Sequence, residues 1–431
     1  MSGYENYTLS PVPWIKQMPE HWGLVRGKNL YQKMQRPTSD TDEVVTCFRD
    51  GTVTLRKNRR TTGFTESLKE IGYQGIRKGD LVIHVMDAFA GSIGVSDSDG
   101  KGTPVYSVCQ AKGNSNNQYY ALLLREMARS GYIQSLYRGI RERSSDFRFE
   151  VFAAQFYPVP PREEQDQIVR FLDWKVSSIN RLINIKQEQL RKVKELLDRL
   201  FRDTTSKCSK KVKIKYLFEL DDDFFVPDAS ESYAKAGMYN RGRGIFLREP
   251  CLSNELGDSQ FQHIHSDRLM LSGQFAWEDA VYITQEKDTH GIASHRYYLL
   301  KPVRYIPVEY LWLYFLSGEG FFNLQQCSHG SAGRNRPLNI KEVLNLELPV
   351  PDDKEKANAL NELVRDYMRL QVITEEEKKA LLDFKTHLVA DIVTGKIDVR
   401  GIDIPEYEFV DEDTDADNED DGEEDTEEQE D

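Results

Sequence analysis

The sequence predicts an α+β fold with two similar halves, each a mostly β globular region followed by a long helix. Two observations support this prediction. A helical pattern of apolar positions without glycine or proline begins after Pro161 and returns after Pro351, and short β-type segments precede it each time. An internal repeat of this length is typical of a duplicated architecture. We therefore predict a duplicated chain rather than one large domain.

The first long helix is predicted over residues 158–206. Its apolar side chains recur at alternating steps of four and three, as at Ile168, Leu172 and Ile179, which is typical of a helix that packs along another helix. At 1.5 Å per residue, about forty residues would span roughly 60 Å, more than one small domain. We therefore expect this helix to pair with a second one.

The second long helix is predicted over residues 349–396. Its opening, Pro349-Val350-Pro351, repeats Pro158-Val159-Pro160 after 191 positions, and its end, Thr394-Gly395-Lys396, repeats Thr205-Ser206-Lys207 after 189 positions. Two whole helices thus match to within two residues. Leucine and isoleucine along their apolar seams can pair the two helices.

These boundaries leave two globular regions, residues 1–157 and 207–348, and a C-terminal extension, residues 397–431. In the first region, β segments are predicted at 44–48, 53–55, 81–85, 92–95 and 105–109, with a short helix or turn at 27–33 and a helix at 118–136. In the second, they are predicted at 243–248, 275–277, 280–284 and 296–300, with a helix at 307–316.

Composition fits a globular protein of the cytoplasm. The chain has 431 residues, of which 39% are hydrophobic, and no apolar run approaches the length of a membrane span. The first residues lack the apolar core of a signal peptide. Five widely scattered cysteines without a CxxC pair favour reduced thiols over a disulfide framework or a zinc site.

The net charge of −14 is concentrated in the tail. Residues 411–431 hold fifteen Asp or Glu and no Lys or Arg, and removing those charges leaves +1 for the rest of the chain. We predict a disordered acidic tail from about residue 411, and the near-neutral body is compatible with a nucleic-acid partner. The tail either solubilises the protein or mimics DNA and docks on a basic partner.

Motifs for catalysis are absent from the sequence. It has no Walker A motif and no Asn-Pro-Pro-aromatic signature of adenine methyltransferases. Pro351-Asp352-Asp353-Lys354 superficially resembles a nuclease metal motif, but acidic residues there favour the first turn of the second helix. His263, His265, His290 and His295 could form a metal site, although surface or core histidines are the commoner case. We predict no catalytic residue and no metal site.

Basic residues in turns are the remaining candidates for binding a ligand. Arginine binds both phosphates and guanine, and asparagine suits adenine, so such turns on a β scaffold favour DNA binding. The candidates form four groups: Arg56, Lys57, Asn58, Arg59 and Arg60; Arg138, Arg141, Arg143 and Arg148; Asn240, Arg241 and Arg243; and Arg334, Asn335 and Arg336. Any single group is also compatible with a charged surface loop.

Several motifs together resemble the DNA-specificity subunit of type I restriction-modification systems. They are Pro13-Trp14 with Met18-Pro19-Glu20-His21-Trp22, Pro158-Val159-Pro160-Pro161-Arg162-Glu163-Glu164-Gln165, Leu348-Pro349-Val350-Pro351, and Val393-Thr394-Gly395-Lys396-Ile397-Asp398-Val399-Arg400. The resemblance covers the chain in order to about residue 400. It implies that regions 1–157 and 207–348 are two target-recognition domains, each reading one half of a bipartite, asymmetric DNA sequence. It also implies that the two long helices hold these domains apart and pack as an antiparallel coiled coil.

The resemblance also implies partners and cofactors. The partners would be double-stranded DNA, two methyltransferase subunits that use S-adenosylmethionine, and restriction subunits that use ATP and Mg²⁺ to translocate and cut DNA. This chain would bind none of these cofactors, would catalyse nothing itself and would have no membrane partner. The alternative from another class is a coiled-coil structural or interaction protein with two β binding domains.

The first helix has more apolar surface than a two-helix seam requires. We expect this extra surface to dock the methyltransferase subunits, unless the chain's own globular regions cover it. The side chains that widen the apolar surface are Phe171, Val176, Leu182, Ile183 and Leu197.

Overall fold

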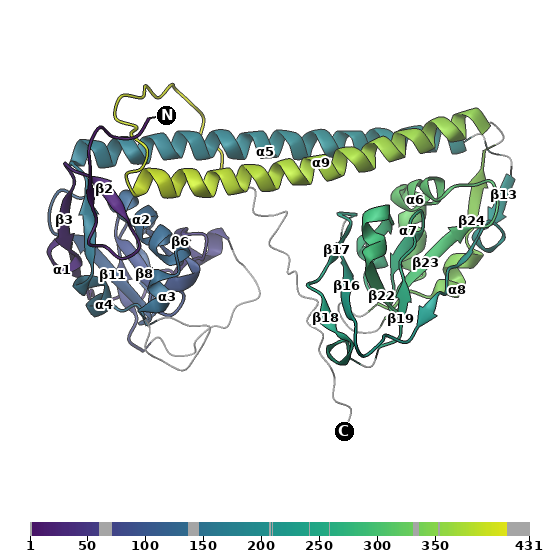
Figure 1. Cartoon of the computed structure of the whole chain (residues 1–431), viewed down its shortest axis with the longest axis horizontal. Coiled ribbons are helices and arrows are strands. Elements are labelled where there is room, and N and C mark those ends of the chain that lie inside the picture. The colour runs from purple at the N-terminus through teal and green to yellow at the C-terminus, as the bar shows by residue number, and fades with distance from the viewer. Residues whose placement is uncertain are drawn as a thin grey trace. The chain divides into compact units, whose positions relative to one another are not determined.

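A computed structural model describes residues 2–59, 71–136, 146–206, 208, 210–240, 242–257, 259–330, 336–351 and 354–411. It forms two compact units, one made of Met1–Ile183 with Lys378–Asp413 and the other containing Asn184–Glu377. Both units combine a mostly β region with stretches of two long helices, which confirms the predicted fold class (Figure 1). The acidic tail lies beyond the described residues.

The long helices are α5, Arg162–Thr205, and α9, Lys354–Val393. Both begin after the prolines that the sequence prediction had included in them. Proline lacks a backbone N–H and suits a short strand at a sheet edge. Accordingly, the segments before the helices are strands β12, Phe156–Val159, and β24, Glu347–Val350.

Helices α5 and α9 pack against each other within each unit (Figure 1). In the first unit, Ile168 near the start of α5 shares a buried cluster with Ile392 near the end of α9. In the second unit, Phe201 near the end of α5 shares a buried cluster with Leu360 near the start of α9. In each unit the start of one long helix therefore lies beside the end of the other, so the two helices are antiparallel.

The first unit is built on a four-stranded antiparallel sheet. Its order is β4 (Tyr31–Lys33), β11 (Tyr106–Ala111), β8 (Leu81–His84) and β9 (Ile93–Val95). Because successive side chains of a strand point to opposite faces, Leu81 and Ile83 join the core with helix α2, Asn117–Arg129. Val82 joins a second core with the hairpin β5 (Val45–Cys47) and β6 (Val53–Leu55).

The second unit repeats this sheet order. Its strands are β14 (Phe218–Leu220), β23 (Tyr297–Pro302), β20 (Leu269–Ser272) and β21 (Val281–Ile283), in the same sequence of neighbours. Helix α6, Val308–Leu316, lies in the core with them. Strand β13 (Lys210–Lys213) pairs with β24 as β3 (Gly23–Arg26) pairs with β12. The duplication read from the sequence therefore extends to topology.

The remaining elements complete the two units. In the first they are β1 (Tyr7–Leu9), β2 (Gln17–Pro19), α1 (Gly27–Leu30), η1 (Arg56–Asn58), β7 (Gln74–Ile76), η2 (Ala88–Ala90), β10 (Gly100–Gly102), α3 (Tyr132–Ser135) and α4 (Phe149–Ala154). In the second they are η3 (Ile214–Tyr216), β15 (Phe224–Phe225), β16 (Ser232–Met238), β17 (Ile245–Leu247), β18 (Cys251–Leu252), η4 (Ser253–Glu255), β19 (Phe261–His263), η5 (Ala276–Glu278), η6 (Glu286–His290), β22 (Gly291–Ser294), α7 (Gly318–Gln326) and α8 (Ile340–Asn345). Within the described ranges, no helix has the length and apolar character needed to cross a membrane.

Three further sequence predictions need correction. The short helix or turn predicted at 27–33 ends at Leu30 as α1, and Tyr31–Lys33 form strand β4. The helix predicted at 118–136 is split into α2 and α3, because Gly131 takes a left-handed conformation with φ +76° between them. The strand predicted at 275–277 is a 3-10 turn, η5, which ends at Asp279 with φ +62°. Its buried Ala276 gave the segment an apolar, strand-like appearance.

A buried carboxylate ties the N-terminal segment to the start of α5. Glu164 accepts hydrogen bonds from Tyr4 Oη at 2.6 Å and Trp22 Nε1 at 2.9 Å. His21 Nε2 lies 2.8 Å from its other oxygen, while only 3% of the Glu164 side chain is exposed. The carboxylate thus holds three partners from a segment that precedes it by more than 140 residues.

The segment after α9 packs along α5 in the first unit. Ser177 Oγ donates to the Glu408 carbonyl at 3.0 Å and accepts from the Val410 backbone N–H at 2.7 Å. Asn180 Nδ2 donates to the Val410 carbonyl at 3.1 Å. The Asp398 backbone N–H donates to the Ser2 carbonyl at 3.0 Å. Residues 398–410 therefore connect the N-terminal segment with α5.

Candidate nucleic-acid interface

In the first unit, the hairpin turn at residues 48–52 lies against η2. A Cβ added to Gly91, the residue directly after η2, would lie 2.8 Å from the Arg49 carbonyl oxygen, so the two backbones are in close contact. Arg49 Nη2 lies 3.2 Å from Asp87 Oδ1 beside η2. Within the hairpin, Arg59 stacks over the Phe48 ring at 4.6 Å. This turn therefore presents arginines beside a 3-10 turn.

In the second unit, the hairpin turn at residues 239–244 lies against η5. The Gly242 backbone N–H donates to the Asp279 carbonyl at 2.7 Å, and Asn240 Nδ2 donates to the Glu278 carboxylate. Arg243 lies over the Tyr239 ring at 5.1 Å. The second hairpin thus meets the 3-10 turn that joins β20 to β21, and the first meets the turn that joins β8 to β9.

A third segment reaches the same place in each unit. The Phe147 backbone N–H donates to the Val85 carbonyl at 3.2 Å, just before η2, and the Leu338 N–H donates to the Gly273 carbonyl at 2.8 Å, just before η5. Phe147 and Leu338 are 191 positions apart, the offset that relates the proline motifs. We call the turn 48–52, η2 and residues 146–148 the first three-segment surface. The turn 239–244, η5 and residues 336–338 form the second.

The second three-segment surface brings together three of the DNA-binding candidates. Asn240 and Arg243 come from its hairpin turn, and Arg336 stacks over the Trp277 ring of η5 at 4.9 Å. Stacking on an aromatic ring holds the guanidinium plane while leaving its N–H groups available for a ligand. The arrangement suits a guanidinium that contacts a base edge or a phosphate.

The first three-segment surface includes fewer of the candidates. Arg148 follows Phe147 and bonds Asp146 at 2.6 Å, and Arg59 pairs with Asp50 at 2.5 Å. Burial raises the pKa of Asp50, but hydrogen bonds from the Thr52 backbone and Arg59 outweigh it and leave the pKa lowered. The Asp50 carboxylate is therefore ionised when it pairs with Arg59.

The other candidates of the 56–60 group bond along their own hairpin. Lys57 Nζ lies 2.5 Å from the Glu43 carboxylate, Asn58 Nδ2 donates to Thr54 Oγ1 at 2.8 Å, and Arg56 Nε donates to Thr46 Oγ1 at 3.3 Å. The candidates that lie outside the described residues are Arg60, Arg138, Arg141, Arg143, Arg241, Arg334 and Asn335. Asp352 and Asp353 of the nuclease-like motif also lie outside them.

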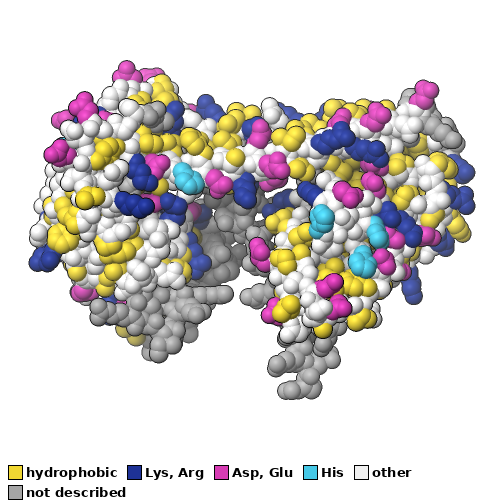
Figure 2. Space-filling view, viewed as in Figure 1, with side chains coloured by type: hydrophobic (Ala, Val, Ile, Leu, Met, Phe, Trp, Pro, Cys, Tyr) yellow, Lys and Arg dark blue, Asp and Glu magenta, His cyan; other side chains and the backbone are white. Residues whose placement is uncertain are grey.

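Reading the sequence alone missed the partners of these arginines. Phe48, Tyr239 and Trp277 supply the aromatic faces, and Asp87 and Glu278 supply carboxylates. A signal was present, because both 3-10 turns open with alanine followed by an aromatic residue, Ala88-Phe89 and Ala276-Trp277. Acidic and basic side chains also alternate over the viewed face, without one dominant charge (Figure 2).

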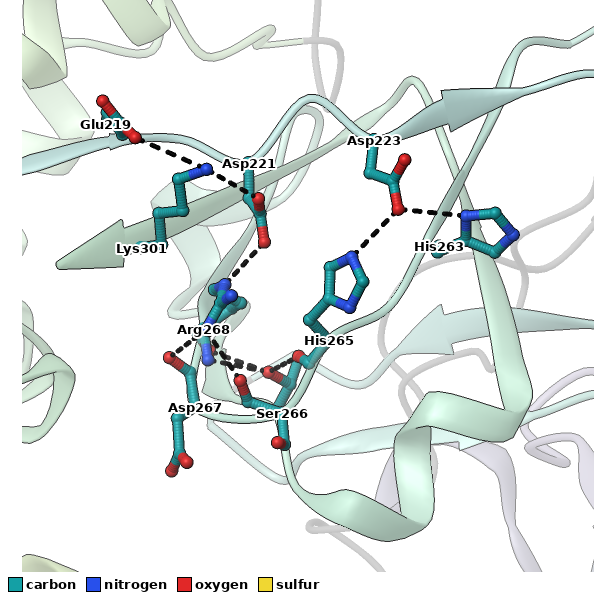
Figure 3. Close-up of polar contacts among 10 residues, drawn as sticks. Glu219, Asp221, Asp223, His263, His265, Ser266, Asp267, Arg268 and Lys301 are labelled. Atoms are coloured by element: carbon teal, nitrogen blue, oxygen red, sulfur yellow. Dashed lines mark hydrogen bonds and ion pairs between the residues drawn. The ribbon is translucent and has the colours of Figure 1, made fainter. Parts of the chain in front are cut away.

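Two aspartates organise a separate polar cluster in the second unit (Figure 3). Asp223 Oδ2 lies 3.1 Å from His263 Nδ1 and 3.0 Å from His265 Nε2. Hydrogen bonds from His265 and His263 lower the pKa of Asp223. His290 and His295 take no part in these hydrogen bonds. Within the described part of the chain, no group of three metal-ligating side chains is arranged to hold an ion.

Asp221 has two cationic partners and makes the second unit sensitive to acid. Arg268 Nε donates to it at 2.5 Å and Lys301 Nζ at 3.1 Å, and the residue is 7% exposed. Burial raises the pKa of Asp221, but these two hydrogen bonds outweigh it and leave the pKa lowered. A lowered pKa in the folded state stabilises the fold above the unfolded pKa, and this stabilisation is lost as the pH falls through the folded value.

We therefore expect Asp221→Asn to lower the free energy of unfolding of the second unit by about 1–3 kcal/mol at pH 7. The difference from the parent should shrink as the pH falls below about 4, because protonated aspartate also loses its ion pairs. Denaturant unfolding at pH 7 and pH 3.5 measures both effects. Asp222→Asn, at the exposed neighbouring position, is the control. A loss for Asp221→Asn that does not change with pH would contradict this explanation.

The structure changes which docking candidates are available. Phe171 and Ile183 are buried in the first unit and Leu197 in the second, so the chain's own cores cover them. Val176 is half-buried, and Leu182 is 41% exposed. The apolar periodicity identified the helix but not which neighbour covers each position. Further exposed apolar residues on the helices are Ile185, Leu196, Leu363, Leu370, Ile373 and Phe384.

Comparison with known proteins gives matches among solved structures. No family model and no curated protein matches the chain. A structure concerning complex assembly and conformational transition of the type I restriction-modification system aligns with a TM-score of 0.56 at 12% identity, covering 91% of this chain and 100% of that one. The HsdS subunit from Thermoanaerobacter tengcongensis aligns with a TM-score of 0.44 at 12% identity, covering 88% and 98%. The type I S subunit from M. genitalium aligns with a TM-score of 0.44 at 12% identity, covering 91% and 99%. The resemblance read from the sequence is thus confirmed at the level of the fold, because the chain shares its fold with a chain from a structure of the type I restriction-modification system.

Proposed function

We propose that this chain is the sequence-reading, non-catalytic DNA-binding subunit of a type I restriction-modification complex. Each unit reads one half of a bipartite, asymmetric target in double-stranded DNA. The observation that best supports this proposal is the pair of three-segment surfaces, which occupy equivalent places on the repeated sheet. Their side chains differ: the first carries Arg49, with Arg59 lying over its Phe48 ring, and the second carries Asn240, Arg243 and Arg336. Equivalent surfaces with different side chains suit two different half-sites.

In this proposal the partner subunits carry out the chemistry. Two methyltransferase subunits with S-adenosylmethionine modify adenines, and restriction subunits with ATP and Mg²⁺ translocate and cut DNA. The first of the structures reported above concerns assembly of a type I system, which supports association with partner subunits. This chain would contribute recognition and a docking surface, and its localisation would be cytoplasmic.

Genome-wide base-modification sequencing tests the proposal directly. The chain is co-expressed with its neighbouring methyltransferase subunit in a host without adenine methylation. Methylated adenines that fall in one split, asymmetric motif would support the proposal and would provide both half-sites. A complex that forms without modifying any adenine would contradict it and would favour a structural interaction protein instead.

The exposed apolar side chains on the long helices suit a protein partner. Leu182→Glu should weaken association with the methyltransferase subunit about tenfold or more, because a charge replaces apolar surface worth about 1.5–3 kcal/mol on burial. Co-purification at matched expression, followed by titration, measures this. Leu182→Met retains apolar surface and serves as the control. Equal association of Leu182→Glu and the parent would exclude docking at this position.

A further inference from the structure

The recognition turn of the second unit is attached to both long helices. Gln371 of α9 donates from Nε2 to the Gly242 carbonyl at 2.8 Å. The Gly242 N–H donates to the Asp279 carbonyl at 2.7 Å, and Lys194 of α5 holds the Asp279 carboxylate at 3.0 Å. Both backbone polar groups of Gly242 are therefore used. We call Lys194, Asp279, Gln371 and Gly242 the turn clasp.

The turn clasp is more enclosed than an ordinary surface ion pair. The side chain of Lys194 is 30% exposed and that of Asp279 is 21% exposed. Burial raises the pKa of Asp279, and Lys194 opposes that rise. A Cβ added to Gly242, which has φ +67°, would lie 3.3 Å from Asp279 Oδ2 and 3.5 Å from Lys194 Nζ. The turn therefore lies directly against the pair.

The clasp acts on the residues that carry the recognition chemistry. Asn240 and Arg243 lie on either side of the clasped Gly242, and Arg243 Nε donates to the Asn240 carbonyl at 3.1 Å. Fixing Gly242 therefore limits the positions open to both side chains. A ligand that contacts both side chains in one geometry binds more tightly when they are fixed, because their conformational entropy is lost on folding and not on binding.

The first unit fixes its turn differently. A Cβ on Gly51 would lie 2.7 Å from Arg125 Nη1, so this turn packs against α2. The ion pair of the turn with η2 joins Arg49 to Asp87. In the described residues the first turn contacts α2 and η2, whereas the second turn is bonded to α9 directly and to α5 through Asp279. The two units are thus alike in topology and different in how their turns are held.

We propose that Lys194, Asp279 and Gln371 are positioning residues for recognition by the second unit. This proposal rests on the proposed function. It adds a way in which recognition by the second three-segment surface is regulated. Through the clasp, recognition of its half-site by the second unit depends on how α5 and α9 are placed against the turn. Leu196 and Leu370, which are 54% and 38% exposed, lie within two residues of Lys194 and Gln371, so a docked protein would act on the same stretch. In the first unit, whose turn packs against α2, we expect recognition not to depend on the helix pair in this way.

The test uses the full chain with Lys194→Met combined with Gln371→Leu. Hydrogen exchange of the peptide covering 239–244 is measured first, because it needs no DNA. We expect exchange to accelerate about tenfold when the Gln371 hydrogen bond to the turn and the Lys194 hydrogen bond to Asp279 are both lost. Lys186→Met is the matched control, since it removes the 2.6 Å pair between Lys186 of α5 and Glu377 of α9 without touching the turn. Unchanged exchange, or equal acceleration in the control, would overturn the clasp.

The second readout is discrimination between DNA half-sites. Competition binding uses duplexes altered in one half at a time, and Arg243→Ala identifies the half that the second unit reads. We expect the clasp variant to lose about tenfold discrimination at that half and none at the other, with Lys194→Arg restoring most of it. Equal loss at both halves would overturn the positioning role. If the parent chain shows no sequence discrimination, the proposed function fails, while hydrogen exchange still decides whether the helices hold the turn.

Discussion

Replacing Glu164 by alanine should lower the free energy of unfolding of the first unit by roughly 3–5 kcal/mol. Glu164 accepts from Tyr4 Oη and Trp22 Nε1 and is reached by His21, and its side chain is only 3% exposed. The alanine leaves two buried donors without an acceptor, each costing about 1–3 kcal/mol. Denaturant unfolding followed by hydrogen exchange of peptides from 4–22 measures the loss.

Glu163 provides a control at the adjacent position. It lies in the same first turn of α5 but is exposed, so Glu163→Ala should change stability by no more than about 0.5 kcal/mol. The contrast separates loss of the buried network from loss of a helix N-terminal charge, which both variants share. Equal effects in the two variants would show that the network contributes little.

The largest functional effect is expected from Arg243→Ala combined with Arg336→Ala. Each guanidinium lies on an aromatic ring of the second three-segment surface, and a bidentate contact to guanine is worth about 1–3 kcal/mol. We expect affinity for the cognate duplex to fall roughly a hundredfold or more, with little change for duplexes already altered in that half-site. Fluorescence-anisotropy titration of the full chain measures this.

Two further variants define what these arginines contact. Arg336→Lys keeps the charge but loses the planar fork, so a phosphate contact survives it and a bidentate base contact does not. Arg369→Ala removes an exposed arginine of α9 that pairs with Asp366, and it should leave cognate discrimination unchanged. If affinity falls equally for all duplexes and its salt dependence also weakens, the arginines bind phosphate only.

The long helices and several strands could be predicted from the sequence, because they follow from local patterns of apolar and turn residues. The steps of four and three located α5 and α9, and β-type segments separated by turn residues located β8 and β9. The prediction failed where a single backbone conformation decides the structure, as at Gly131, which splits a helix, and at Asp279, which ends η5. Strand β20, Leu269–Ser272, was missed because it contains none of the β-branched residues that mark β8, Leu81–His84, as strand-like.

The site could be predicted only in part, because its geometry depends on residues distant in sequence. The basic groups were visible, but Trp277 under Arg336 and Glu278 beside Asn240 could not be paired from one chain. The burial of the docking candidates likewise could not be predicted from helical spacing. Helical spacing marked Phe171 as apolar, yet it could not reveal that the first unit's own core covers it.

The contacts between the two chain ends bear on how the protein is made by the ribosome. The core of the first unit contains Tyr4 and also Val393 and Val399, so it cannot close until Val399 has been synthesised. The described part of the second unit ends at Glu377 and is therefore made before that point, although it begins later in the chain. Because exposed apolar surface on a nascent chain favours aggregation, a premature stop before Val393 would leave the earlier-made unit without its closing helix, a natural substrate for chaperones and proteases.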